Sequence, residues 1–179
     1  MNSLSPPGRQ PHPLALELIE RLKSQPGARV REVGTGSGRN RDALLSAGFR
    51  VNESHRYDAA LSTHALLHGR RHDVAQAVAE IVGALESAAP FFATFGSRRD
   101  SRFGRGIKTD GNTYAPESGD EAGVLHCYFN EPELRALLEP HVVIESLQET
   151  AVDRIAGTWA HSLAPLRGAV HWFVRARTR

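Results

Sequence analysis

The sequence of 179 residues predicts an α/β fold in which a mostly parallel sheet is flanked by helices. Short apolar runs alternate with segments of helical periodicity along most of the chain, which is typical of strand–helix–strand units. A glycine-rich turn separates the first apolar run from the helix after it. Two further strand-like runs, at 141–149 and 168–177, close the chain.

The N-terminal part contributes an arm, two helices and two strands. Residues 1–13 contain four prolines and are expected to form a loose arm ahead of a single domain at 14–179. Gly48 suits the end of a helix, where a left-handed backbone is common. The elements expected here are helices at 14–24 and 39–48 and strands at 28–34 and 49–51.

The remaining elements follow the same reasoning. Segment 97–124 is rich in Gly, Arg, Asp and Ser without a period, and a loop of this length is usually functional or disordered. Asn130 is the expected N-cap of a helix that carries Pro132 in its first turn. The elements expected are strands at 57–64 and 90–97 and helices at 73–87 and 130–140.

Composition indicates an ordinary water-soluble protein. The formal net charge of +2 is too small to predict a nucleic-acid partner. Cys127 is the single cysteine, so an internal disulfide is impossible. The polar N-terminus has no apolar signal-peptide core, and no apolar run approaches the ~18 residues of a membrane span. We therefore expect a cytoplasmic protein without a membrane partner.

The glycines Gly34, Gly36 and Gly38 lie between a strand and a helix, where a turn of this kind binds ligands. Glycine lets the backbone turn sharply and approach a ligand, and the helix N-terminus adds N–H donors. A dinucleotide fingerprint needs a glycine where Arg39 stands, which disfavours NAD. A phosphate-binding Gly-Lys-Ser/Thr sequence is absent. A plain strand-to-helix turn remains the alternative.

Several motifs resemble class I S-adenosylmethionine-dependent methyltransferases. EVGTGSG at 32–38 resembles their first motif, YDAALSTHALLHG at 57–69 their fourth-strand motif, and 128–149 with 171–177 their C-terminal half. Gly38-Arg39-Asn40 and the C-terminus are similar to the tellurite-resistance-type group. The resemblance implies a Rossmann-like sheet with an antiparallel C-terminal strand. It also implies S-adenosylmethionine as cofactor and methyl transfer to a small-molecule acceptor.

The same resemblance assigns roles to residues of the first and fourth strands. The glycine turn would lie under the amino-acid part of the cofactor, with Glu32 fixing the turn. Residues just past the strand at 57–62 would face the sulfonium and the acceptor. The residues implied are Glu32, Gly34, Thr35, Gly36, Gly38, Ser62 and Thr63 for the cofactor, with His64 as a catalytic candidate.

A segment expected between the second and fourth strands is absent. Only five residues separate Val51 from Tyr57, whereas a parallel crossover needs about a dozen or more. Three explanations are open: a missing stretch of residues, which would leave a break in the chain; a real deletion in the protein; or a different strand order. We expect the break. Glu53 is a candidate for holding the cofactor ribose, although an exposed loop carboxylate is the simpler interpretation.

His64, His68 and His72 are spaced like one helix face, but Gly69 interrupts it and no Glu follows His64, so no metal site is expected. The segment 97–124 suits a lid over an acceptor, with a solvated mobile loop as the alternative. His126 and Tyr128, where it rejoins the fold, are the candidate substrate-binding residues. Asp120 and Glu121 could order this loop or bind a cation.

The resemblance also places a His and Arg pair near the active site, in the connection between the last two strands. His161 and Arg167 occupy comparable positions and are further catalytic candidates, since Arg can hold an anionic acceptor and His can take a proton. A non-catalytic remnant that lost half of the adenosine pocket is the main alternative function, and an NAD-binding module is a weaker one. The acceptor and the oligomeric state stay open.

Overall fold

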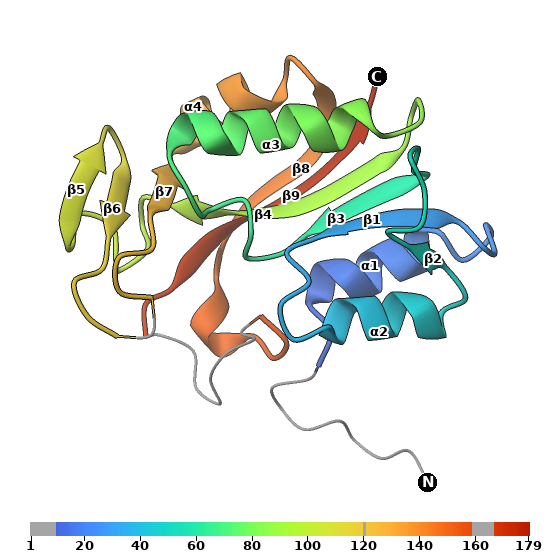
Figure 1. Ribbon diagram of the computed structural model, residues 1–179, viewed down its shortest axis with the longest axis horizontal. Helices are drawn as coiled ribbons and strands as arrows, with labels where there is room; N and C mark the ends of the chain where they lie inside the picture. Colours follow the sequence, from blue (N-terminus) through green and yellow to red (C-terminus); the bar gives the residue numbers. More distant parts are fainter. Residues whose placement is uncertain (1–9, 120, 159–166) are drawn as a thin grey trace, which may run out of the picture.

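The computed structural model describes residues 10–119, 121–158 and 167–179. Its centre is a sheet with the order β2-β1-β3-β4-β7-β6-β5, and β9 pairs with both β4 and β8 (Figure 1). Strands β1 (Arg29–Val33), β2 (Arg50–Val51), β3 (Ala59–Ser62) and β4 (Pro90–Ser97) are parallel. Strand β9 (Val170–Thr178) runs antiparallel to β4 and to β8 (Val142–Ala151). The predicted α/β class with its antiparallel C-terminal strand is confirmed.

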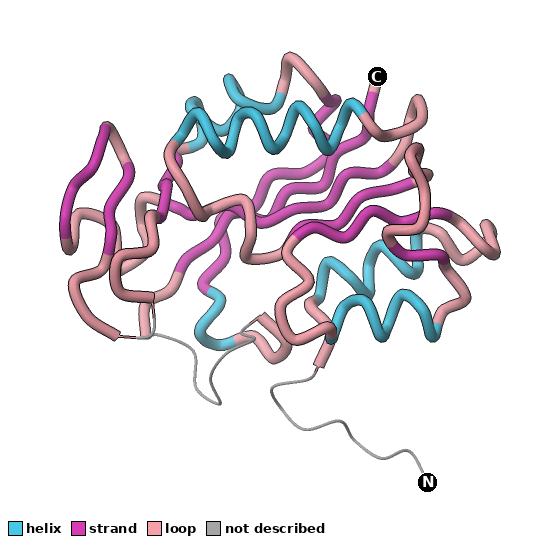
Figure 2. Tube along the Cα trace, viewed as in Figure 1, coloured by secondary structure: helices cyan, strands magenta, loops and turns pink. Residues whose placement is uncertain are grey.

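Helices cover both faces of this sheet (Figures 1 and 2). Apolar side chains of α1 (Pro13–Arg21) and α2 (Arg39–Ser46) pack on one face around Val30 and Leu61. Those of α3 (Arg71–Gly83) and α4 (Glu131–Leu138) pack on the other around Phe91 and Phe95. A short 3-10 turn, η2 (Val152–Arg154), follows β8. Within the described ranges, none of the helices is long and apolar enough to span a bilayer.

The predicted break between Val51 and Tyr57 is wrong, because residues 52–58 join β2 to β3 as a continuous segment (Figure 1). The two strands do flank β1 on opposite sides, but β2 ends level with Val30 and β3 begins at the same level. The chain therefore needs no return along the sheet. Two strand spacings are about 10 Å, and eight extended residues reach about 26–29 Å.

Hydrogen bonds hold this short connection on the face covered by α3. The backbone N–H of Tyr57 donates to the carbonyl of Ala84 (2.9 Å). Asp58 receives two hydrogen bonds from the guanidinium of Arg29, at 3.0 and 2.6 Å. The connection is thus part of the packed fold, and a crossover helix is not required to close it.

Segment 97–124 is more regular than expected. It contains a hairpin of β5 (Ile107–Asp110) and β6 (Thr113–Ala115), and β6 pairs with β7 (His126–Phe129). The expected arm at 1–13 lies mostly outside the described residues. Of its last residues, His12 is fully buried and its Nδ1 accepts the N–H of Leu14 (3.1 Å) at the start of α1.

Candidate functional site

The glycine turn connects the end of β1 to the start of α2 in a left-handed backbone conformation. Gly34, Gly36 and Gly38 have φ angles of 81°, 49° and 80°. A Cβ on Gly34 would lie 2.4 Å from the Cβ of Ala65. The turn therefore packs directly against the segment after β3, and only glycine permits that approach at position 34.

A cavity of about 140 Å³ lies beside this turn, at the carboxyl ends of β1 and β3. Ligands of open α/β sheets bind at this edge. The N-terminus of α2 borders the cavity, and its free N–H groups and partial positive charge favour an anionic group. The lining residues are Gly34, Thr35, Gly36, Ser37, Arg39, Asn40, Thr63, His64, Ala65 and His68.

A buried hydrogen-bond chain holds one wall of the cavity. Asn40 donates through Nδ2 to Oγ1 of Thr63 (2.9 Å), and its Oδ1 accepts the backbone N–H of His12 (2.8 Å). All three residues are at most 5% exposed. These hydrogen bonds fix α2 relative to β3, so the cavity wall is preorganised.

Glu32 is buried under the glycine turn, and neither of its carboxylate oxygens has a hydrogen-bond partner among the described residues. Burial raises its pKa to about 6, and the positive charge of Arg41 and the nearby amide of Asn40 oppose this rise. A buried carboxylate without a partner is costly. It is therefore available to a hydrogen-bond donor that the described part of the chain does not supply.

A second, open groove of about 530 Å³ lies on the other side of Gly34. Asn52, the residue after β2, lines this groove, whereas Glu53 is exposed and lies outside the lining of both cavities. The groove occupies the sheet end next to the short connection from β2 to β3. Its lining residues are Arg31, Glu32, Val33, Gly34, Asn52, Ser54, His55, Tyr57 and Ala84.

Three histidines gather behind the cavity wall. The ring centroid of His64 lies 5.5 Å from that of His12 and 4.9 Å from that of His171. Burial lowers the pKa of His12 and His64 well below the usual value, and lowers that of His171 to about 3. The three rings are therefore neutral at physiological pH.

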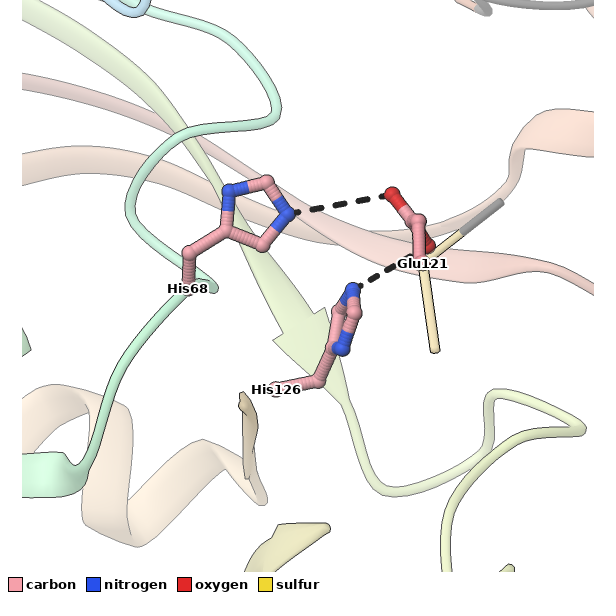
Figure 3. A group of neighbouring side chains, drawn as sticks. All are labelled: His68, Glu121 and His126. Carbon is pink, nitrogen blue, oxygen red and sulfur yellow. Dashed lines mark ion pairs between the residues drawn. The ribbon is translucent and has the colours of Figure 1, made fainter. Parts of the chain in front are cut away.

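The histidines at 64, 68 and 72 do not converge. His64 joins the neutral group, and His72 pairs with Asp73 (3.0 Å) at the start of α3. His68 instead faces Glu121 and His126 (Figure 3). His126 is thus brought to the edge of the cavity by His68, which lines it.

Other predicted site residues lie elsewhere. Ser62 is buried, donates to the carbonyl of Val33 (3.3 Å) and is absent from the cavity lining. Tyr128 is buried against the rings of Phe103 and Tyr114, and burial raises its pKa. Arg167 is exposed, and its carbonyl accepts a hydrogen bond from Ser101. His161 and Asp120 lie outside the described residues.

Sequence reasoning missed several residues that shape the site. Arg39 lines the cavity and donates to the carbonyls of Gly157 and Gln10, which ties distant segments to the glycine turn. Arg102 pairs with the fully buried Asp100 through two hydrogen bonds of 2.8 and 2.9 Å. Such long-range contacts have no local sequence signal, although an arginine directly after the glycine turn was a visible departure from the dinucleotide pattern.

Comparisons with known proteins identify the fold. No family model matches the chain, and no curated protein sequence matches it. It is similar to the structure of a Burkholderia thailandensis 1,6-didemethyltoxoflavin-N1-methyltransferase with bound 1,6-didemethyltoxoflavin and S-adenosylhomocysteine. The TM-score is 0.65 and the identity 19%, over 93% of this chain and 77% of the other.

Two further methyltransferase structures have a similar fold. The Synechocystis magnesium protoporphyrin IX methyltransferase with bound S-adenosylmethionine has a TM-score of 0.59 and 12% identity, over 93% of this chain and 78% of the other. A Clostridium acetobutylicum S-adenosylmethionine-dependent methyltransferase has a TM-score of 0.59 and 9% identity, over 92% of this chain and 90% of the other. The tellurite-resistance-type subgroup is not confirmed, since different methyltransferases match with similar scores. The chain has the fold of the class I S-adenosylmethionine-dependent methyltransferases.

Proposed function

We propose that the protein transfers a methyl group from S-adenosylmethionine to a small-molecule acceptor. The observation that carries the proposal is the cavity at the left-handed glycine turn, at the carboxyl ends of β1 and β3. Bound S-adenosylmethionine supplies an electrophilic methyl group on a positively charged sulfur. The similar Burkholderia enzyme, whose structure contains S-adenosylhomocysteine and a small-molecule acceptor, supports this choice.

The residues around the turn fit such a cofactor. The N-terminus of α2 and Arg39 suit the carboxylate of its amino-acid part. Glu32, whose buried carboxylate has no hydrogen-bond partner among the described residues, suits a cationic amino group or a hydroxyl donor. The groove beyond Gly34 offers room for adenosine beside Asn52, whose position makes it a better candidate for the ribose than Glu53.

The neutral state of His64 matters for this chemistry. A charged imidazolium on the cavity wall would repel a sulfonium, and burial removes that charge by lowering the pKa of His64. A neutral ring also presents a lone pair, which can accept a hydrogen bond from an acceptor group and so orient it. Alignment of the acceptor with the methyl group supplies much of the rate in such a reaction. We therefore keep His64 as the catalytic candidate.

A protein that binds the cofactor without transferring its methyl group is the second candidate. It is favoured by the open groove and by the two-residue β2, because a full adenosine pocket would have more of the chain around it. Neither observation removes the glycine turn or its cavity. Binding and turnover must therefore be measured separately.

Calorimetric titration with S-adenosylhomocysteine and with NAD⁺ tests the binding step. We expect one molecule of S-adenosylhomocysteine per chain and no heat from NAD⁺, since Arg39 replaces the glycine that a dinucleotide requires. S-adenosylhomocysteine release from S-adenosylmethionine in the presence of small-molecule acceptors then tests turnover. Binding without turnover across the acceptor set would favour the second candidate, and NAD⁺ binding alone would refute both.

A further inference from the structure

We propose that His68, Glu121 and His126 form a binding site for a divalent transition-metal ion at the edge of the cavity. One ligand atom from each residue lies within 4.8 Å of the other two. His68 Nε2 is 3.9 Å from Oε1 of Glu121, and His126 Nε2 is 3.2 Å from Oε2 (Figure 3). Two imidazoles and a carboxylate are a ligand set that Zn²⁺ and similar ions use.

The backbone holds the two histidines side by side. His68 and His126 form an antiparallel bridge, flanked by hydrogen bonds from Gly69 N–H to Leu125 (2.9 Å) and from Cys127 N–H to Leu67 (2.7 Å). Residues opposite each other in such a bridge direct their side chains to the same face. Their ring centroids are 5.0 Å apart, so the pair is positioned by the fold before any ion binds.

The hydrogen bonding of His126 leaves its Nε2 available to a metal ion. Its Nδ1 lies 2.8 Å from the carbonyl oxygen of Val124, which can only accept, so Nδ1 carries the hydrogen. In a neutral ring Nε2 then presents a lone pair. This nitrogen is buried and has no hydrogen-bond partner among the described residues, and it lies 3.2 Å from a carboxylate oxygen of Glu121, which also presents lone pairs. A metal ion between the two atoms would accept lone pairs from both.

The spacing of His126 and Glu121 fits a bound metal ion. The contact between His126 and Glu121 is 3.2 Å but does not meet the geometry of a hydrogen bond. Two ligands about 2.0–2.1 Å from a tetrahedral ion are about 3.3–3.4 Å apart, close to this spacing. The carbonyl of Val124 fixes the ring of His126, as outer partners commonly fix metal-binding histidines.

The surroundings of Glu121 also bear on the site. Arg102 approaches Oε2 of Glu121 at 3.4 Å and is the competing cation, but Asp100 binds its guanidinium at 2.8 and 2.9 Å. His68 is 41% exposed at its side chain, which leaves a path for an ion and for exchangeable ligands. Hard ions such as Mg²⁺ and Ca²⁺ prefer oxygen ligands and are not expected here.

An ion at this place would keep coordination positions that the protein does not fill, since three side chains leave at least one position of a tetrahedron open. His68 also lines the cavity, so those positions would border it. If the proposed methyl transfer holds, an acceptor with a lone-pair donor atom could bind there. This last clause rests on the proposed function, whereas the metal site itself does not.

Metal binding is tested on the full chain, freed of affinity tags and treated with a chelator. We expect equilibrium dialysis with Zn²⁺ to give one ion per chain, and Co²⁺ to give a visible spectrum with nitrogen ligation. His68→Ala and Glu121→Gln should each weaken Zn²⁺ binding at least about tenfold. His72→Ala and Glu117→Gln are the matched controls, a nearby histidine and a carboxylate of the same segment, and should bind as the wild type does.

Two outcomes would overturn the site: no stoichiometric Zn²⁺ binding, or equal affinity in all four variants. The first means that these three residues hold no such ion, and the second means that Zn²⁺ binds elsewhere on the chain. Titration of Glu121→Gln with S-adenosylhomocysteine separates this result from the cofactor site. Unchanged cofactor affinity with lost Zn²⁺ binding supports two distinct sites.

Discussion

Asn52 shows how one residue closes the edge of the shortened sheet. It follows β2 with a left-handed backbone (φ 59°). Its side chain, and not its backbone, makes the next hydrogen bonds to β1. Its Oδ1 accepts the N–H of Glu32 (2.8 Å) and its Nδ2 donates to the carbonyl of the same residue (2.9 Å). The amide thus takes the place of a peptide group beside β1, next to the glycine turn.

We expect Asn52→Ala to lower the free energy of unfolding by about 2 kcal/mol, from two lost hydrogen bonds and a less favourable left-handed backbone. Asn52→Gly removes the amide but relieves the backbone, so it should cost less. Urea unfolding of both variants measures the difference. Equal stability of wild type and Asn52→Ala would show that the amide does not support the strand.

The neutral histidines make stability depend on pH. Because the folded pKa values of His12, His64 and His171 are lowered by burial, the unfolded chain binds more protons below its ordinary histidine pKa of about 6.5. Stability is then full above this pH and falls as the pH decreases. Glu32 acts in the opposite direction below pH 6, because its folded pKa is raised to about 6.

The three histidines outweigh the single carboxylate, so the free energy of unfolding should fall by on the order of 1 kcal/mol or more between pH 7.5 and 5.5. Urea unfolding at the two pH values measures it. His12→Asn keeps an acceptor for the N–H of Leu14 and should reduce the dependence. A protein equally stable at both values would contradict neutral burial of these rings.

At the scale of elements, the loop after β4 is anchored and not a free lid. The carboxylate of Asp100 is fully buried and accepts from Arg102 and from the N–H of Val170 (2.9 Å), which ties the loop to β9. Ser97 and Glu149 form a further contact between β4 and β8. Motion on ligand binding is therefore expected in 116–119 and 121–125, beyond the hairpin.

Asp100 is the closest carboxylate to the largely buried Arg102, so removing it weakens the pairing of a buried charge. Asp100→Ala should lower the free energy of unfolding by about 3 kcal/mol or more, as measured by denaturant titration. Glu20→Ala, which removes an exposed pair with Lys23, is the control and should change it by less than about 0.5 kcal/mol. A similarly small loss of unfolding free energy in Asp100→Ala and Glu20→Ala would mean that Arg102 pairs with other groups.

Local patterns predicted most elements. Strand β4 has the predicted bounds, and Asn130 accepts the N–H of Glu133 as the predicted N-cap of α4. Strands β5, β6 and β7 were not predicted, because β5 is exposed throughout and glycines and charges hide the hairpin's alternation. Strand β2 has only two residues, too few for an alternation of apolar and polar side chains that would show its length. The connection after it was therefore judged too short.

At the scale of the whole molecule, the sequence predicted the backbone of the site better than its side chains. The glycine turn, Thr63 and His64 lie at one cavity, since they follow adjacent parallel strands. The contacts of Arg39, His12 and Arg102 depend on residues far away in the chain. Ser62 lies one residue before Thr63 and donates to the carbonyl of Val33, because alternate side chains along β3 point to opposite faces.

The affinity for S-adenosylhomocysteine of a matched pair of glycine variants tests the central claim most directly. Gly36 and Gly27 both have positive φ angles, 49° and 75°, and neither has a neighbour that a Cβ would strike, but only Gly36 lines the cavity. Gly34 is unsuitable, because Ala65 makes its substitution a change of packing. Calorimetry should show that Gly36→Val loses at least about tenfold in affinity while Gly27→Val, with a similar backbone strain, binds as the wild type does. Equal affinity of the two variants, with both folded, would contradict a cofactor site at this turn.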